Sequence, residues 1–220
     1  MKAKSMTEYL AGGGRGSRMK FEGEWLAHMG QPERRGTIII CGPSFNGKTR
    51  YAIKLCKQLS YFTKVLYNSF EEAGRDSLRQ AFEQEGMRER NGHVQVLDGE
   101  PMDELAKRLS EKRSAGAVII DSLQYTRMSY EQYVEFTRGF PDKLFVFISH
   151  ADGKKPAGST AERVWYDAGV KVWVSLYTAY AQSRYGGGQP YVVWSKRVTE
   201  LSVNKIDENR NSNIQEDDRD

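Results

Sequence analysis

Five short, mostly continuous apolar runs alternate with polar, amphipathic segments between residues 37 and 150. Continuous runs rich in β-branched residues are typical of strands buried on both faces, as in a parallel sheet. Their alternation with helices predicts an α/β fold with a doubly wound, mainly parallel twisted sheet flanked by helices. The expected strands are 37–41, 64–70, 93–98, 117–121 and 144–150, and the expected helices are 48–59, 73–87, 102–114 and 129–138.

After Ala168 this alternation stops. Three apolar segments, 170–177, 178–185 and 189–196, follow one another with short breaks. Short connections join antiparallel neighbours, so we expect these segments to extend one edge of the sheet as antiparallel strands. The glycine run 186–188 is then a hairpin turn, and we prefer this interpretation to a phosphate-binding loop.

The 220 residues suit one domain, which we place at 21–203. A basic arm (1–20) precedes it and an acidic tail (204–220) follows it. We expect the arm to be flexible and the tail to be disordered. The formal net charge is +4, although the segment from Asp207 to Asp220 holds six acids against two arginines. Residues 1–206 therefore carry a formal net charge of +8, which suits DNA binding and is equally compatible with an ordinary charged surface.

Composition argues against membrane and secreted classes. No apolar run approaches the ~20 residues that span a bilayer, and the N-terminus lacks the apolar core of a secretory signal. The two cysteines, Cys41 and Cys56, lie in segments that we expect to be buried, so no disulfide framework is predicted. These features predict a cytoplasmic protein without a membrane partner.

The segment from Gly42 to Thr49 matches the pattern G-x-x-x-x-G-K-[ST] between an expected strand and an expected helix. The backbone N–H groups of such a turn point at phosphate oxygens, and the positive end of the helix adds to the attraction. Lys48 would reach the β- and γ-phosphates, and the Thr49 hydroxyl would hold Mg²⁺. A chance glycine turn is the alternative, and the flanking strand and helix favour the phosphate site. The predicted nucleotide-binding residues are Gly42, Pro43, Ser44, Phe45, Asn46, Gly47, Lys48 and Thr49.

Two acidic positions are expected beside this loop, because carboxyl ends of parallel strands share one edge of a sheet. Asp121 ends the apolar run 117–121 and is the predicted metal ligand; the alternative is an N-cap of the next helix. Glu71 follows the run 64–70 and is the predicted base, whereas Glu72 begins the next helix. Both glutamates could instead serve only to favour a helix N-terminus.

These motifs, in this order, resemble the core of RecA-type P-loop ATPases, closest to the RadA/Sms branch and with features shared by DnaB-type helicases. The resemblance covers about residues 34–197. Ser69-Phe-Glu-Glu72 stands where that branch has Ser-Gly-Glu-Glu, and Ile120-Asp-Ser-Leu-Gln124 matches its Walker B pattern. Ser149-His150 stands in place of Gly-His, and Ala157-Gly158 precedes Asp167 at the family's spacing.

The resemblance implies roles for the residues that follow. His150 would sense the γ-phosphate, and 151–163 would be the mobile loop that meets DNA. A strand-end histidine bonded only to backbone is the alternative for His150. For Lys154 and Lys155, a solvated turn and DNA phosphate contact are both open.

The chain departs from the family near its C-terminal edge. The family's Lys-Asn-Arg-Phe-Gly motif reaches into a neighbour's nucleotide site, and here Gln182-Ser-Arg-Tyr-Gly186 takes its place. Only Arg184 remains for such a contact, which implies a homo-oligomer, either a ring or a filament. The family's zinc ribbon and protease-like domain have no counterpart in these 220 residues.

The resemblance implies an ATPase that uses ATP and Mg²⁺ and acts in DNA recombination, repair or replication, together with other replication or recombination proteins. Its origin would be a phage or a mobile element. Glu71 would orient the attacking water, while Lys48, Thr49 and Asp121 oppose the phosphate charge. The alternative is a regulatory or scaffold protein whose ATP state switches partner binding with little turnover. A P-loop kinase is disfavoured because no arginine cluster suggests a lid.

Two other signals are set aside. Asn204-Lys-Ile-Asp207 copies the guanine-reading motif of GTPases, but it begins a polar tail instead of ending an apolar strand. A group of aromatic residues near the C-terminal edge could stack on bases, and packing between the last strands and a helix is the preferred interpretation. This group is Trp165, Tyr166, Trp173, Tyr177 and Tyr180.

Overall fold

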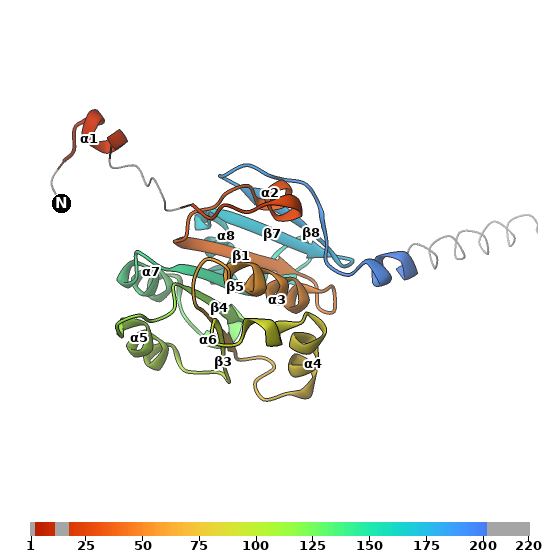
Figure 1. Ribbon diagram of the computed structural model, residues 1–220. Helices are drawn as coiled ribbons and strands as arrows, with labels where there is room; N and C mark the ends of the chain where they lie inside the picture. The colour runs from red at the N-terminus through yellow and green to blue at the C-terminus, as the bar shows by residue number, and fades with distance from the viewer. Residues whose placement is uncertain (1–2, 12–17, 202–220) are drawn as a thin grey trace, which may run out of the picture.

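A computed structural model describes residues 3–11 and 18–201, and it shows a mixed sheet with helices on both faces (Figure 1). The nine-stranded sheet has the order β3-β2-β4-β5-β1-β7-β8-β9, and β6 pairs with β5 beside this path. The strands are β1 (Gly36–Gly42), β2 (Val65–Ser69), β3 (Val94–Leu97), β4 (Ala117–Asp121), β5 (Leu144–Asp152), β6 (Lys155–Pro156), β7 (Val170–Ser175), β8 (Thr178–Ser183) and β9 (Tyr191–Val192).

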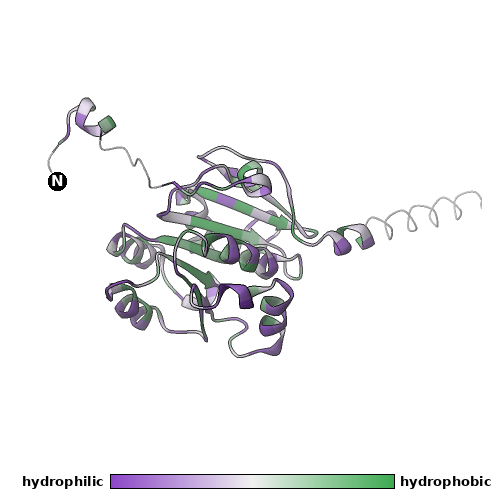
Figure 2. Cartoon of the chain, in the orientation of Figure 1, coloured by the Kyte–Doolittle hydropathy of each residue, from purple (hydrophilic) through white to green (hydrophobic). Residues whose placement is uncertain are grey.

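The helices form two layers, each with its own half of the core. Buried side chains of α2, α3 and α4 pack on one face of the sheet, and those of α5, α6, α7 and α8 pack on the other. The strands between them are mainly apolar and the outer helix faces are polar (Figure 2). The helices are α1 (Met6–Ala11), α2 (Gly23–Met29), α3 (Lys48–Leu59), α4 (Asp76–Gln84), α5 (Met102–Ser110), α6 (Leu123–Thr126), α7 (Tyr130–Gly139) and α8 (Ser159–Asp167), with a 3-10 helix η1 (Met87–Arg90).

The register of the parallel strands brings their carboxyl ends to one edge of the sheet. β1 pairs with β5 so that Gly42 lies opposite His150, and β2 pairs with β4 so that Ser69 lies opposite Asp121. β4 and β5 are also parallel neighbours. The loop after β1 and the last residues of β4 and β5 therefore lie together, as the sequence motifs require.

The predicted fold class is confirmed: the sheet is mainly parallel, and β7, β8 and β9 extend it as antiparallel strands. Differences lie outside the parallel core. The segment 189–196 yields only the two-residue strand β9. The helix expected at 73–87 is shorter, Asp76–Gln84, and η1 begins where it was expected to end. Helix α2 has no counterpart among the expected elements, and β5 runs on into a hairpin with β6.

The N-terminal segment is partly integrated into the core. Met19, which falls inside the expected arm, is buried together with Phe21, whereas α1 has no buried residue. Residues 1–2 and 12–17 of that arm, and the whole expected tail 204–220, lie outside the described residues. Within the described part of the chain, no helix has the length and apolar character needed to cross a membrane.

A buried histidine fastens α2 to the rest of the fold. His28 is fully buried; its Nδ1 lies 2.8 Å from the Gln189 carbonyl oxygen and its Nε2 lies 2.8 Å from the Tyr51 hydroxyl. The rings of Trp25 and Tyr191 pack around it. A neutral imidazole satisfies both contacts by donating from Nδ1 and accepting at Nε2. Burial lowers the pKa of His28, so the folded state favours this neutral form.

This preference predicts a loss of stability in mild acid. Because the pKa is lowered on folding, the unfolded chain binds a proton at His28 more readily, and stability falls as pH drops through the unfolded value of about 6.5. From pH 7.5 to pH 5.5 we therefore expect this residue to lower the free energy of unfolding. Urea unfolding of wild type and His28→Gln at both pH values measures it. The variant, which cannot titrate at this position, should lose that part of the pH dependence; an unchanged dependence would contradict the assignment.

Candidate functional site

The loop between β1 and α3 has a backbone that only certain residues permit. A Cβ atom at Gly42 would lie 2.0 Å from the Val174 carbonyl oxygen, so only glycine fits there. Gly47 has φ of 97° and directly precedes α3, which begins at Lys48. Phe45 adopts φ of 59° and is 94% exposed. The loop therefore leads directly into the N-terminus of α3. Backbone N–H groups gathered at a helix N-terminus form the geometry of an anion site.

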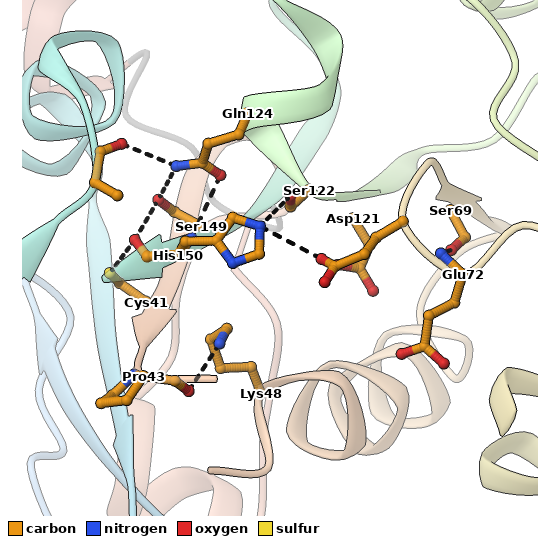
Figure 3. Close-up of polar contacts among 12 residues, drawn as sticks. Cys41, Pro43, Lys48, Ser69, Glu72, Asp121, Ser122, Gln124, Ser149 and His150 are labelled. Atoms are coloured by element: carbon orange, nitrogen blue, oxygen red, sulfur yellow. Dashed lines mark hydrogen bonds and ion pairs between the residues drawn. The ribbon is translucent and has the colours of Figure 1, made fainter. Parts of the chain in front are cut away.

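Lys48 points back across this loop. Its ammonium group donates a hydrogen bond of 2.9 Å to the Pro43 carbonyl oxygen (Figure 3), and the residue is only 9% exposed. Burial lowers the pKa of Lys48, although the nearby Glu71 and Asp121 carboxylates favour its charged form. A buried cation held at the mouth of an anion site is well placed to neutralise phosphate oxygens.

Asp121 ends β4 in an almost fully buried position, 2% exposed. The Tyr67 hydroxyl donates a hydrogen bond of 2.9 Å to its Oδ2 atom. Burial raises the pKa of Asp121 to about 7, against the effect of that bond. Thr49, at the start of α3, and Asp121 line one cavity beside the loop. A hydroxyl and a carboxylate are the oxygen ligands that Mg²⁺ prefers, so these residues fit that ion, and a bound cation would favour the charged carboxylate.

The two glutamates after β2 point to different partners. Glu71 Oε2 lies 3.5 Å from His150 Nε2, and the Ser122 hydroxyl oxygen lies 3.3 Å from the same nitrogen. Glu72 instead accepts a hydrogen bond of 2.6 Å from the Ser77 hydroxyl. The structure therefore brings Glu71, and not Glu72, beside the histidine at the end of β5.

Gln124 connects this histidine to a surface hairpin. Its Nε2 donates to Ser149 Oγ at 2.8 Å and to the Ala157 carbonyl oxygen at 2.9 Å, and its Oε1 accepts from the His150 backbone N–H at 3.3 Å (Figure 3). Ala157 follows the β5–β6 hairpin directly. Sequence reasoning placed Gln124 in a motif without giving it a role, because its partners are distant in the sequence.

The segment 151–163, expected as a mobile DNA loop, is ordered as the β5–β6 hairpin and the start of α8. Lys154 lies exposed in the hairpin turn. Lys155 pairs with Glu162 at 2.8 Å, which ties the hairpin to α8.

Arg184 lies apart from the other predicted site residues. β8 runs antiparallel to β7, so Ser183 pairs with Val170 at the start of β7, and the Arg184 N–H donates to the Gly169 carbonyl oxygen. Arg184 therefore lies where the parallel strands begin, and the loop at 42–47 lies where they end. Within one chain, Arg184 therefore cannot reach the candidate site.

A cavity of about 430 Å³ opens beside the loop and contains most of the predicted residues. A larger one, about 810 Å³, lies among α4, η1 and β3 and contains none of them, so size alone does not mark the site. Eight of its lining residues were not assigned to the site from the sequence, and among them are Arg50, Tyr177 and Trp194. Its full lining is Ser44, Phe45, Gly47, Lys48, Thr49, Arg50, Glu71, Glu72, Ser77, Gln80, Ala81, Gln84, Asp121, Tyr177 and Trp194.

Solved structures share this architecture. No protein-family model and no curated protein matches the sequence. A structure solved as an ATPase domain aligns with a TM-score of 0.51 at 15% identity, over 75% of this chain and 83% of that one. The flagellar accessory protein FlaH from Methanocaldococcus jannaschii aligns with a TM-score of 0.56 at 13% identity, over 79% of this chain and 91% of that one. The ATP synthase subunit NeqB from Nanoarcheaum equitans aligns with a TM-score of 0.52 at 10% identity, over 68% of this chain and 48% of that one.

The fold is that of RecA-like ATPase domains. At these identities the likeness concerns the fold alone, and it does not select the RadA/Sms branch.

The buried position of Lys48 predicts a specific loss of nucleotide binding in Lys48→Ala. A charge-assisted hydrogen bond contributes roughly 1.5–3 kcal/mol, so ATP affinity should fall by about tenfold or more while the fold is kept. Isothermal titration calorimetry with MgATP measures the affinity, and circular dichroism checks the fold. Lys112→Ala removes an exposed lysine and is the matched control. Near-wild-type affinity in a folded Lys48→Ala protein would refute the phosphate site.

Proposed function

We propose that the chain is an ATP-hydrolysing ATPase with a RecA-type domain at 21–203, closest to the RadA/Sms branch. The observation that carries the proposal is the convergence of Lys48, Glu71, Asp121 and His150 at the carboxyl edge of the sheet. Each comes from a different strand end or loop. Together they supply a cation, a base, a metal ligand and, beside the base, an imidazole. An ATPase needs these groups in one place.

The chemistry follows from where these residues lie. The loop N–H groups and Lys48 hold the triphosphate and oppose its charge. Glu71 orients a water and takes its proton as the water oxygen bonds to the γ-phosphorus and the bond to the β–γ bridging oxygen breaks. Thr49 and Asp121 would hold Mg²⁺, which when bound neutralises phosphate charge.

His150 can couple this reaction to the rest of the molecule. It lies 3.5 Å from the proposed base, and its backbone N–H is bonded to Gln124, which is itself bonded to the Ala157 carbonyl oxygen. These contacts, together with the bond from the Ala157 N–H to the His150 carbonyl oxygen, connect the γ-phosphate position to the β5–β6 hairpin. This chain of contacts supports a sensing role for His150.

We further propose that the ATPase acts in the cytoplasm on DNA, in recombination, repair or replication, and that the chain comes from a phage or a mobile element. The basic character of residues 1–206 and the exposed Lys154 in the β5–β6 hairpin support a DNA contact. The position of Arg184 at the opposite sheet edge supports a homo-oligomer, because only a neighbouring copy could bring it to a nucleotide site.

A regulatory or scaffold protein with little turnover is the second candidate. The Gln124 contacts favour it, since they can transmit nucleotide occupancy to the hairpin without hydrolysis. ATPase assays with and without single- and double-stranded DNA separate the two. DNA-stimulated hydrolysis supports the enzyme, and ATP binding without turnover in either condition supports the switch.

Glu71→Gln should separate binding from chemistry. The amide keeps the size of the side chain but cannot take a proton, so turnover should fall by roughly 10²-fold or more while ATP still binds. Phosphate release with and without DNA measures turnover. Glu72→Gln, whose wild-type carboxylate accepts from Ser77 and lies apart from His150, is the matched control. Unchanged turnover in Glu71→Gln would remove its role as the base.

Arg184 allows a test of a shared site. If it acts on a neighbour, Arg184→Ala should bind ATP but lose turnover, and mixing it with Glu71→Gln should restore part of the activity. The restoration arises because some interfaces in the mixture contain both wild-type groups. A protein that stays monomeric by light scattering with ATP and DNA, yet hydrolyses at full rate, would refute the model.

A further inference from the structure

The turn between β7 and β8 has an unusual sequence for its shape. Leu176 and Tyr177 adopt φ of 47° and 58°, the left-handed region, in a two-residue hairpin turn that usually contains asparagine and glycine. Large side chains reach this region only against steric resistance. Among the described residues, five non-glycine positions have positive φ, and three of them, Phe45, Leu176 and Tyr177, belong to the phosphate loop or to this turn. Backbone strain of this kind gathers at binding and catalytic sites.

The phosphate loop itself holds the turn in place. Asn46 Oδ1 accepts a hydrogen bond of 2.7 Å from the Leu176 N–H, and the Asn46 carbonyl oxygen accepts one of 3.1 Å from the Tyr177 N–H. Asn46 Nδ2 donates to the Ser44 carbonyl oxygen at 2.8 Å. On the other side, the Val193 N–H donates to the Tyr177 carbonyl oxygen at 2.8 Å. Asn46 is therefore a positioning residue for Tyr177.

These bonds fix an aromatic wall in the cavity. The Tyr177 ring lies against Gly47, where an added Cβ would be 3.0 Å from Tyr177 Cδ1. It meets the Trp194 ring at 5.8 Å between centroids and 88° between planes. The Arg50 guanidinium carbon lies 4.0 Å from the Trp194 ring centroid, and Glu85 pairs with Arg50. The side chains of Tyr177, Trp194 and Arg50 all line the cavity that also contains Lys48.

We propose that Tyr177 and Trp194 form an aromatic subsite for the base of the nucleotide whose triphosphate the loop binds. Because the two rings are perpendicular, the base stacks on one and meets the edge of the other. The inference rests on the proposed function and adds the recognition of the base. The cavity, about 430 Å³, is within the size range of small-molecule sites. Neither aromatic ring belongs to the phosphate chemistry, yet the chain uses a sterically costly turn to place one of them there. Every base can stack, but the larger purine rings stack over more area, so the subsite favours purine over pyrimidine nucleoside triphosphates.

The test compares MgATP with inorganic tripolyphosphate, which has the phosphates but no base. Calorimetry is performed on wild type, Tyr177→Gly and Trp194→Ala. We expect each variant to lose about tenfold or more in ATP affinity and to keep its tripolyphosphate affinity, because only the base contact is removed. Tyr177→Gly suits the left-handed backbone and should stay folded. Trp194→Phe keeps an aromatic ring and should retain most of the affinity for ATP.

Tyr166→Ala, which removes an exposed ring on α8, is the matched control and should change neither affinity. Wild type should also bind ATP more tightly than CTP. Equal losses of ATP and tripolyphosphate would show that the rings only support the loop, and would overturn the subsite. Unchanged ATP affinity in both variants would overturn it as well and leave the phosphate site standing. A wild-type protein that binds neither ligand would overturn the proposed function together with the subsite.

Discussion

The parallel pairing of β2, β4, β5 and β1, in that order, determines where the main groups of the site lie. β5 sits between β4 and β1, so a register with Gly42 opposite His150 and Asp121 opposite Ile148 places the loop, the carboxylate and the imidazole within one edge of the sheet. A shift by one residue would turn His150 and Asp121 to the opposite faces of their strands. The apolar interiors of these strands, buried on both faces, hold the register against such a shift.

Burial at this edge also sets the chemistry of the charged groups. Lys48 and Asp121 are both largely withdrawn from water, which lowers the pKa of the amine and raises that of the carboxyl to about 7. Each is paired with a neutral partner, the Pro43 carbonyl oxygen and the Tyr67 hydroxyl. A site built in this way favours a ligand that brings charges of both signs, and a triphosphate with a divalent cation does so.

The sequence was sufficient for the central strands and for the start of the helix after the loop, because these depend on local pattern. The run 117–121 and the helix 48–59 have the predicted bounds. What it could not supply were contacts across long sequence separations. Tyr67, Gln124 and Trp194 gain their places only when distant strands pair, and helix α2 is too short for its period to stand out. For Tyr177, packing was the preferred interpretation and base stacking the alternative; Tyr177 packs against Trp194, and both residues line the cavity.

The bond between Asn46 and the β7–β8 turn also bears on how the protein is made. Asn46 and Leu176 are separated by 130 residues, so the loop leaves the ribosome long before its partner does. A domain folds as a unit, so contacts of such separation must wait until the later segment has been synthesised. The loop at 42–49 is thus complete as a sequence early and as a shape only after β7 and β8 have been synthesised and have joined the sheet beside β1.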